Sequence, residues 1–167
     1  FRNNVWQSLP VTPIECANTN VDIVVLIPPT QLSPSFPIKT DIAGLIIGQD
    51  MYFLGYPYGL HSDLDGASGT PLAFIKKGIC SACEFAPPDC KIIYLDGFNN
   101  PGFSGGPVVF QDQATKELKI AGVIAGFRYE DSQVNNRNVN TGLTVKANTG
   151  IVVAYAITSA VDAIKKN

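Results

Sequence analysis

The apolar segments of this chain have the length of β-strands, and glycine or proline ends most of them. The longest, such as residues 21–29, fall well short of the ~18 uninterrupted apolar residues that a membrane helix requires. The 167 residues include 15 glycines and 12 prolines, and 46% are hydrophobic while only 16% are charged. This mixture is typical of an all-β protein with many turns rather than of a helical bundle. We therefore expect one all-β domain with a substantial core.

The order of apolar runs and turn residues predicts about eight strands followed by one terminal helix. Strands are expected over residues 21–26 (buried), 51–57, 72–80, 91–95, 108–110, 118–126 and 150–157. Between them we expect an extended connection over 28–40, an exposed loop over 61–69, a hairpin tip at 112–117 and a surface loop over 130–141. Thr158 or Ser159 can cap the helix, which Lys165 and Lys166 would stabilise at its C-terminal end.

A single serine lies among glycines in the segment Gly102-Phe103-Ser104-Gly105-Gly106-Pro107. A serine nucleophile needs an exposed oxygen and free backbone N–H groups aimed at the place where an oxyanion develops. Glycines permit the unusual dihedral angles of such a turn and let a substrate carbonyl approach closely. The apolar strand at 108–110 would hold the turn rigidly. Taken alone, the segment also fits an ordinary connection between strands.

Further segments follow in a meaningful order along the chain. They cover residues 22–26, 48–50 with 53–59, 77–82, 96–107 and 150–157. In this order they resemble the catalytic-aspartate strand, the interbarrel strand with its Gly-x-Pro-x-Gly turn, the next strand, the nucleophile loop and the final strand of trypsin-like serine peptidases. The motifs are most similar to the bacterial heat-shock (high-temperature-requirement) branch. The resemblance spans about residues 15–166, and only the serine motif is specific by itself.

The resemblance implies a chymotrypsin-like double β-barrel with a C-terminal α-helix, the first barrel being incomplete in this chain. Residues 1–167 would then form a single peptidase domain. Within it, about 1–45 would be the remainder of the first barrel and a crossing connection, about 46–157 the second barrel, and 158–166 the helix.

The resemblance also implies the chemistry. Ser104 would attack a peptide carbonyl, and the backbone N–H groups of Gly102 and Ser104 would hold the oxyanion. Asp22 would orient and stabilise a histidine that acts as general base. The alternative for Asp22 is a solvated carboxylate at the start of a strand. Its position ahead of a buried strand would make an unpaired carboxylate costly, and this favours a partner.

Two features depart from the family pattern. Digestive enzymes of this fold carry an aspartate directly before the serine, which pairs with a freed N-terminus on activation; here the residue is Phe103, so no such switch is expected. The family histidine precedes the aspartate, whereas the sole histidine of this chain is His61. We expect His61 to be a surface residue, with a role as substitute base as the alternative. All-β domains commonly reach roughly 200–250 residues, so we expect the histidine-bearing part to lie outside these residues.

Substrate preference is expected to involve the residues flanking the site. In this alignment Phe98 and Phe127 would lie near the primary specificity pocket, where uncharged aromatic rings disfavour arginine or lysine side chains. Ala125, Gly126 and Phe127 would offer backbone groups to an extended peptide by strand addition. The alternative is that both phenylalanines belong to the core.

The remaining composition bears on partners. The net charge is −2 and the lysines and arginines do not cluster, so we expect no nucleic-acid partner. The short apolar runs predict no membrane insertion. The resemblance implies a peptide or protein substrate. The four cysteines, Cys16, Cys80, Cys83 and Cys90, allow three pairings. They lack a second Cys-x-x-Cys pair, so we expect buried or bridged structural cysteines, with no metal and no cofactor. The oligomeric state stays open, and the resemblance slightly favours a secreted or periplasmic location.

We therefore expect a serine endopeptidase whose chain, without its base, is nearly inactive and incompletely packed. The alternatives are a catalytically silent, protease-like peptide-binding module and a structural or capsid-like β-barrel.

Overall fold

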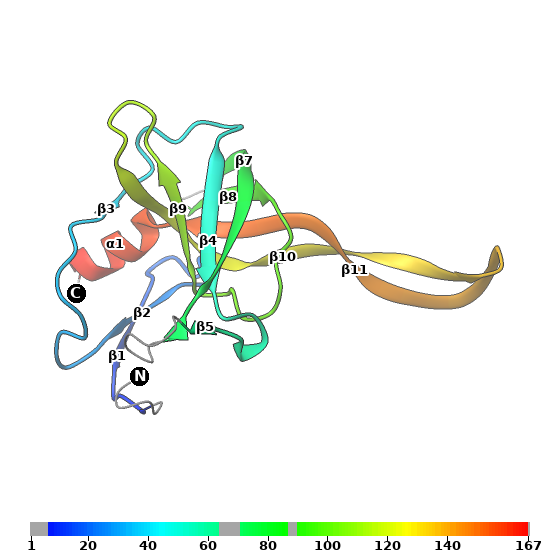
Figure 1. Ribbon diagram of the computed structural model, residues 1–167, viewed down its shortest axis with the longest axis horizontal. Coiled ribbons are helices and arrows are strands. Elements are labelled where there is room, and N and C mark those ends of the chain that lie inside the picture. Colours follow the sequence, from blue (N-terminus) through cyan, green and yellow to red (C-terminus); the bar gives the residue numbers. More distant parts are fainter. Residues whose placement is uncertain (1–6, 64–70, 87–89, 167) are drawn as a thin grey trace.

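The computed structural model describes residues 7–63, 71–86 and 90–166 (Figure 1). These residues form a mostly β structure with one C-terminal helix, which confirms the expected class at this level. The strands are β1 Thr12–Glu15, β2 Val24–Ile27, β3 Lys39–Thr40, β4 Asp50–Gly55, β5 Ser62–Asp63, β6 Pro71–Leu72, β7 Phe74–Ala86, β8 Cys90–Asp96, β9 Pro107–Gln111, β10 Leu118–Asn136 and β11 Val139–Ala156. A 3₁₀ turn occupies Pro57–Gly59, and helix α1 occupies Thr158–Lys166. No helix within the described ranges has the length and apolar character needed to cross a membrane.

Six strands form a hydrogen-bonded ring. Their order is β11-β8-β7-β4-β9-β10, and β10 pairs back with β11 to close it. Every pairing in the ring is antiparallel, and the short β3 adds to β10 in parallel. A ring leaves no free edge along its paired segments, which removes a common route to aggregation.

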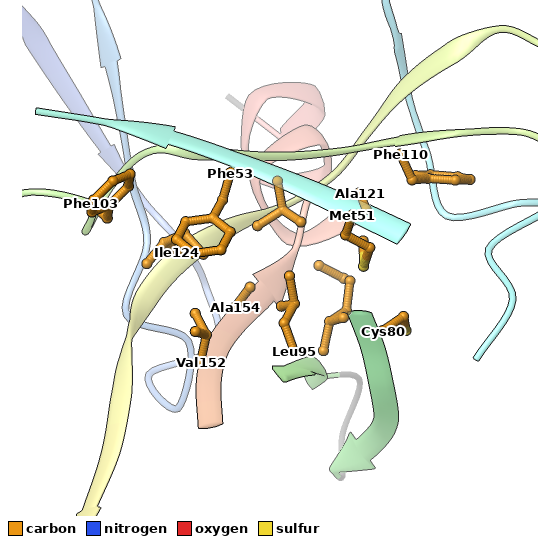
Figure 2. Close-up of a cluster of buried hydrophobic side chains, with 13 residues drawn as sticks. Met51, Phe53, Cys80, Leu95, Phe103, Phe110, Ala121, Ile124, Val152 and Ala154 are labelled. Atoms are coloured by element: carbon orange, nitrogen blue, oxygen red, sulfur yellow. The ribbon is translucent and has the colours of Figure 1, made fainter. Parts of the chain in front are cut away.

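The main core fills the inside of the ring (Figure 2). In β4 the side chains alternate, so that Met51 and Phe53 are fully buried while Tyr52 points to solvent. This period of two is the pattern that one buried face requires of a strand. The other fully buried large side chains of this core include Leu95, Phe103, Phe110, Ile124 and Val152.

A second, smaller core joins the N-terminal hairpin to the outside of the ring. Val21, Ile23 and Ala160 are buried there, with Val123 and Tyr155 packed against them. The hairpin of β1 and β2 and the helix α1 therefore lie together, as Figure 1 shows. This packing fixes the position of residue 22, which is flanked by the two buried side chains of residues 21 and 23.

The expected buried strand at 21–26 was wrong in two respects. The strand begins only at Val24, and Val24 and Leu26 are 50% and 58% exposed. The hairpin is a separate two-stranded sheet. It packs on the rest of the molecule mainly through Val25 and the residues just before β2, which leaves its other face uncovered.

The expected surface loop at 130–141 was also wrong, because most of it is strand. β10 and β11 continue beyond the ring as a long two-stranded arm, which extends to the right in Figure 1. The turn at its tip, Arg137-Asn138, has φ of 46° and 66°. Two successive positive φ values are typical of the tight turns that suit the twist of a hairpin. Main-chain pairing, rather than an aliphatic pattern, holds the arm together.

Three further expectations concern the terminal helix, the hairpin tip and the loop over 61–69. The helix over 158–166 and the hairpin tip at 112–117 are confirmed. Within the expected loop 61–69, Ser62–Asp63 pairs with Pro71–Leu72, and residues 64–69 lie outside the described residues.

A buried ion pair ties the connection before β4 to the turn between β9 and β10. The Lys119 ammonium lies 2.9 Å from a carboxylate oxygen of Asp112, and both side chains are less than a tenth exposed. It also lies 3.2 Å from Asp41 and donates to the carbonyl oxygen of Ala43 at 2.7 Å. A buried ammonium with this many oxygen partners is well compensated for its lost hydration.

This ion pair should make stability fall in acid. The hydrogen bond from Lys119, and then the N–H of Thr115, lowers the pKa of Asp112 from 3.8 to about 2. Because the folded pKa is depressed, the stabilisation is fully present above about pH 3.8 and is lost as the pH falls through about 2. Between about pH 4 and pH 2 we expect wild type to lose more free energy of unfolding than Asp112→Asn, measured by urea titration at each pH. Equal losses in the two proteins would contradict this assignment.

Candidate active site

Ser104 lies on the turn between β8 and β9, and its side chain is exposed. The residue before it, Phe103, is fully buried, with its ring edge-on to Phe53 at a centroid distance of 5.2 Å. Burial of Phe103 anchors the turn in the core and leaves the next side chain facing solvent. The Ser104 hydroxyl donates to the carbonyl oxygen of Ala125 at 3.3 Å, which places it beside β10.

Backbone hydrogen bonds hold this turn from the side of β10. The N–H of Gly105 donates to the carbonyl oxygen of Ile124 at 2.8 Å, and the N–H of Ile124 donates to Gly106 at 2.9 Å. The N–H of Gly106 also donates to the carbonyl oxygen of Phe103 at 2.9 Å. A Cβ at position 106 would collide with the carbonyl oxygen of Leu54, so this position requires glycine.

The other side of the turn is held from the end of β4. The N–H of Tyr56 donates to the carbonyl oxygen of Gly102 at 2.9 Å, and the N–H of Tyr58 donates to Pro101 at 3.1 Å. Gly102 has φ of +101°, and a Cβ there would collide with the carbonyl oxygen of Tyr56. In the part of the chain that the structure describes, the N–H groups of Gly102 and Ser104 donate to no other group. Both are thus available to an incoming acceptor.

Asp22 is positioned by its two buried neighbours. The N–H of Ile23 donates to the carbonyl oxygen of Val21 at 3.0 Å, which makes Asp22 the centre of a three-residue turn. Its carboxylate is exposed and has no hydrogen-bond or ion-pair partner among the described residues. The burial argument for a partner does not hold, because Val21 and Ile23 occupy the core while residue 22 faces outward. The exposed position agrees with the alternative, a solvated carboxylate at the start of a strand.

Asp22 and Ser104 line the same open pocket, although they are far apart in the sequence. The pocket has a volume of about 510 Å³. Its remaining walls are formed by Ile23, Val24, Val25, Gly105, Val123, Ile124, Ala125 and Ala160. His61 is exposed and is not among the lining residues. The structure thus brings a carboxylate and a hydroxyl to one site and places the histidine elsewhere.

The residues expected to bind substrate are only partly brought together. Ala125, Gly126 and Phe127 follow one another along β10 and are half-buried, with Ala125 directly beside Ser104. Phe98 is 57% exposed and its ring lies 5.5 Å from the Lys76 ammonium. No ring contact joins Phe98 to Phe127 within the described ranges. Neither ring belongs to the main core.

Sequence reasoning missed Asn99, which is 1% exposed behind the turn. Its side-chain amide donates to the carbonyl oxygen of Gly126 at 3.2 Å, and its own carbonyl oxygen accepts from the Asn148 amide at 2.8 Å. It thereby ties the serine turn to both β10 and β11. The amide-rich Asn99-Asn100-Pro101 sequence before the glycines was the available signal, since such side chains often satisfy backbone groups in turns.

Sequence reasoning also missed Lys76, which sits on β7. Its ammonium donates to the carbonyl oxygen of Phe98 at 2.7 Å and to the side-chain oxygen of Asn100. The available signal was the alternation of side chains along a strand. Lys76 is two and four residues before the buried Gly78 and Cys80 and so shares their face of the strand, whereas Lys77 lies on the opposite face.

The described cysteine side chains are free thiols. Burial raises the pKa of Cys80 to about 12, and its sulfur lies 4.0 Å from that of Cys83. Burial also raises the pKa of Cys16. The side chain of Cys90 lies outside the described residues. Among the side chains that are described, no three His, Cys, Asp or Glu residues gather where they could hold a metal ion.

No protein-family model matches the chain, and no curated protein matches it. The function must therefore be argued from the geometry of the site.

Proposed function

We propose that this chain carries the nucleophile of a trypsin-like serine endopeptidase. The observation that supports the proposal most strongly is the pocket shared by Asp22 and Ser104. In the proposed fold, the ring of six strands corresponds to the second barrel of a chymotrypsin-like double barrel. The hairpin of β1 and β2, with the connection after it, corresponds to what this chain has of the first.

In the proposed reaction, Ser104 Oγ attacks the carbonyl carbon of a peptide bond and loses its proton to a histidine base. The backbone N–H groups of Gly102 and Ser104 stabilise the oxyanion of the tetrahedral intermediate. Asp22 accepts a hydrogen bond from the imidazole and stabilises its protonated form. The imidazolium then protonates the leaving amine, an acyl-enzyme remains on Ser104, and water hydrolyses it with the same base. The histidine is one that these 167 residues do not contain, and its ring occupies the pocket between Asp22 and Ser104.

The proposed substrate is an extended peptide that pairs with β10 along Ala125–Phe127. Its residue before the scissile bond is uncharged or apolar rather than cationic. The Lys76 ammonium lies 5.5 Å from the centroid of the Phe98 ring. A cationic side chain of the substrate near Phe98 would therefore be repelled by the charge of Lys76.

Free imidazole provides the sharpest test, because the shared pocket is open and large enough to admit it. The chain is incubated with a fluorophosphonate, with and without imidazole, and the adduct is followed by intact mass. We expect slow labelling alone and labelling roughly 100-fold faster with saturating imidazole, since a positioned general base contributes about that factor or more. The adduct should map to Ser104.

Matched variants separate the roles in this test. Ser104→Ala should remove the adduct, whereas Ser132→Ala, on the exposed arm, should not. Asp22→Asn should retain labelling but lose most of the acceleration by imidazole. His61→Ala should behave as wild type. Equal, unaccelerated labelling of wild type and Ser104→Ala would refute the proposal.

A second candidate is a catalytically silent module that binds extended peptides without cleaving them. One observation favours it: among the described residues, no histidine side chain lines the pocket of Ser104. It predicts binding of an unlabelled peptide, seen as shifts of the β10 amides by NMR, with no adduct at Ser104 at any imidazole concentration.

A further inference from the structure

Lys76 makes an unusual set of contacts for a lysine on a strand. Its ammonium donates to the carbonyl oxygen of Phe98 at 2.7 Å and to the side-chain oxygen of Asn100. It also lies over two aromatic rings, 5.2 Å from the centroid of Phe103 and 5.5 Å from that of Phe98. All these contacts belong to the turn that carries Ser104.

The neighbouring lysine shows what a surface role looks like on the same strand. Lys77 is more than half exposed and pairs with Asp50 across the sheet at 2.8 Å. Lys76, by contrast, pairs with no carboxylate in the part of the chain that the structure describes. Burial lowers its pKa, as expected for a cation that exchanges water for neutral acceptors and rings. Among the described residues, the partners of its charge thus all belong to the turn that carries Ser104.

The contacts of Lys76 are linked to the two free N–H groups through Asn100 and Phe103. The backbone carbonyl of Asn100, whose side chain Lys76 binds, accepts the N–H of Phe103 at 3.4 Å. The N–H of Ser104 belongs to the peptide group that follows Phe103, and the N–H of Gly102 belongs to the peptide group that joins Pro101 to Gly102. The conformation of residues 100–103 therefore sets the direction of both N–H groups. Residues just after β4 hold residues 101 and 102, and Lys76, on the neighbouring strand β7, holds residues 98 and 100.

We propose that Lys76 is a positioning residue of the site: its ammonium fixes residues 98–100 and thereby keeps the N–H groups of Gly102 and Ser104 in the arrangement that binds an oxyanion. This inference rests on the proposed function. It predicts that removal of the ammonium weakens binding of a tetrahedral adduct while leaving the ring of strands folded.

The test uses phenylboronic acid, which forms a tetrahedral adduct with an accessible serine and is followed by boron NMR. Lys76→Met should bind it at least tenfold more weakly than wild type, because loss of a single oxyanion donor costs about 100-fold or more in catalysis. Lys76→Arg should recover binding to within about threefold, because a guanidinium can reach the same acceptors. Lys77→Met is the matched control and should bind as wild type. Ser104→Ala should form no adduct.

A second measurement does not depend on reactivity. Amide hydrogen exchange of Phe103 and Tyr58, whose N–H groups bond within the turn, should be faster in Lys76→Met and restored in Lys76→Arg. The N–H of Ile157, which donates to the carbonyl oxygen of Ala121 at 2.8 Å and takes no part in the turn, serves as the internal reference. Wild-type exchange and wild-type boronate affinity in Lys76→Met would overturn the inference.

The two measurements also separate this inference from the proposed function. If wild type and Ser104→Ala are alike in forming no adduct, the proposed function fails. In that case, unchanged amide exchange in Lys76→Met overturns the inference that Lys76 positions the turn. Faster amide exchange in Lys76→Met that returns to the wild-type rate in Lys76→Arg supports that inference.

Discussion

Phe103→Asp is expected to unfold the protein. Phe103 is fully buried, and its ring packs edge-on against Phe53 in the main core. Loss of a buried phenylalanine side chain alone costs about 3–5 kcal/mol. A carboxylate in its place adds the cost of burying a charge, which the Lys76 ammonium, 5.2 Å from the centroid of the Phe103 ring, would offset only in part. The total approaches the roughly 5–15 kcal/mol by which most domains are stable. Circular dichroism at neutral pH should show the loss of the sheet spectrum.

Phe103→Leu provides the control for this prediction. It keeps an apolar side chain in the same place and should cost only about 1–2 kcal/mol, seen as a lower urea midpoint with an unchanged slope. A folded Phe103→Asp protein with a midpoint near that of wild type would show that residue 103 does not anchor the turn.

Gly102→Ala is expected to destabilise the turn and to abolish the acceleration by imidazole. The new Cβ would collide with the carbonyl oxygen of Tyr56 and approach the Cα of Pro57 to 2.9 Å, in a residue with φ of +101°. The backbone strain alone costs about 1–3 kcal/mol. Relief of the clash requires the peptide at residue 102 to move, which displaces one of the two proposed oxyanion donors. Fluorophosphonate labelling with imidazole should therefore fall by about 100- to 1,000-fold.

Gly105→Ala is the control that separates the steric clash of an added Cβ from the backbone strain of a positive φ. Gly105 lies in the same turn with φ of +83°, but a Cβ there meets no atom within 4 Å. This variant should lose about 1–2 kcal/mol of stability and keep most of its labelling rate. If the two alanine variants label at the same rate, the N–H of Gly102 takes no part in binding the oxyanion.

Local sequence was a good guide where local forces decide the structure. The terminal helix occupies Thr158–Lys166, the range that the sequence predicted. The expected caps, Thr158 or Ser159, lie inside the helix, and the carbonyl oxygen of Ile157 accepts the N–H of Val161 at 3.0 Å. The hairpin tip at 112–117 was equally predictable, because its turn residues lie between two apolar runs. The arm was not, since its residues carry no aliphatic period and its strands are held by pairing with each other. A ladder of main-chain hydrogen bonds leaves little trace in the identity of the side chains.

The residues of the candidate site also divide into those that local sequence predicts and those that depend on the tertiary structure. The exposed position of Ser104 followed from the glycines around it. That Asp22 shares its pocket was expected only through the resemblance, because it depends on Val21 and Ile23 packing against α1 and β10. Lys76 was not predicted, since its partners are a backbone carbonyl and an amide oxygen supplied by another part of the chain. Contacts of that kind depend on the tertiary structure.

The arm makes one stretch of this protein independent of the rest. Pairing of Gly122–Phe127 with Val152–Ala156 closes the ring, and the register shifts after Phe127, where the arm begins. From Glu130 to Ala147 the hydrogen bonds of the described residues stay within the arm, and none of the described side chains in this stretch belongs to either core. Its length can therefore change by whole residue pairs at little cost in loop entropy. We therefore expect related proteins to differ in the length of the arm before they differ elsewhere. The arm nevertheless begins on β10, the strand that lies beside Ser104.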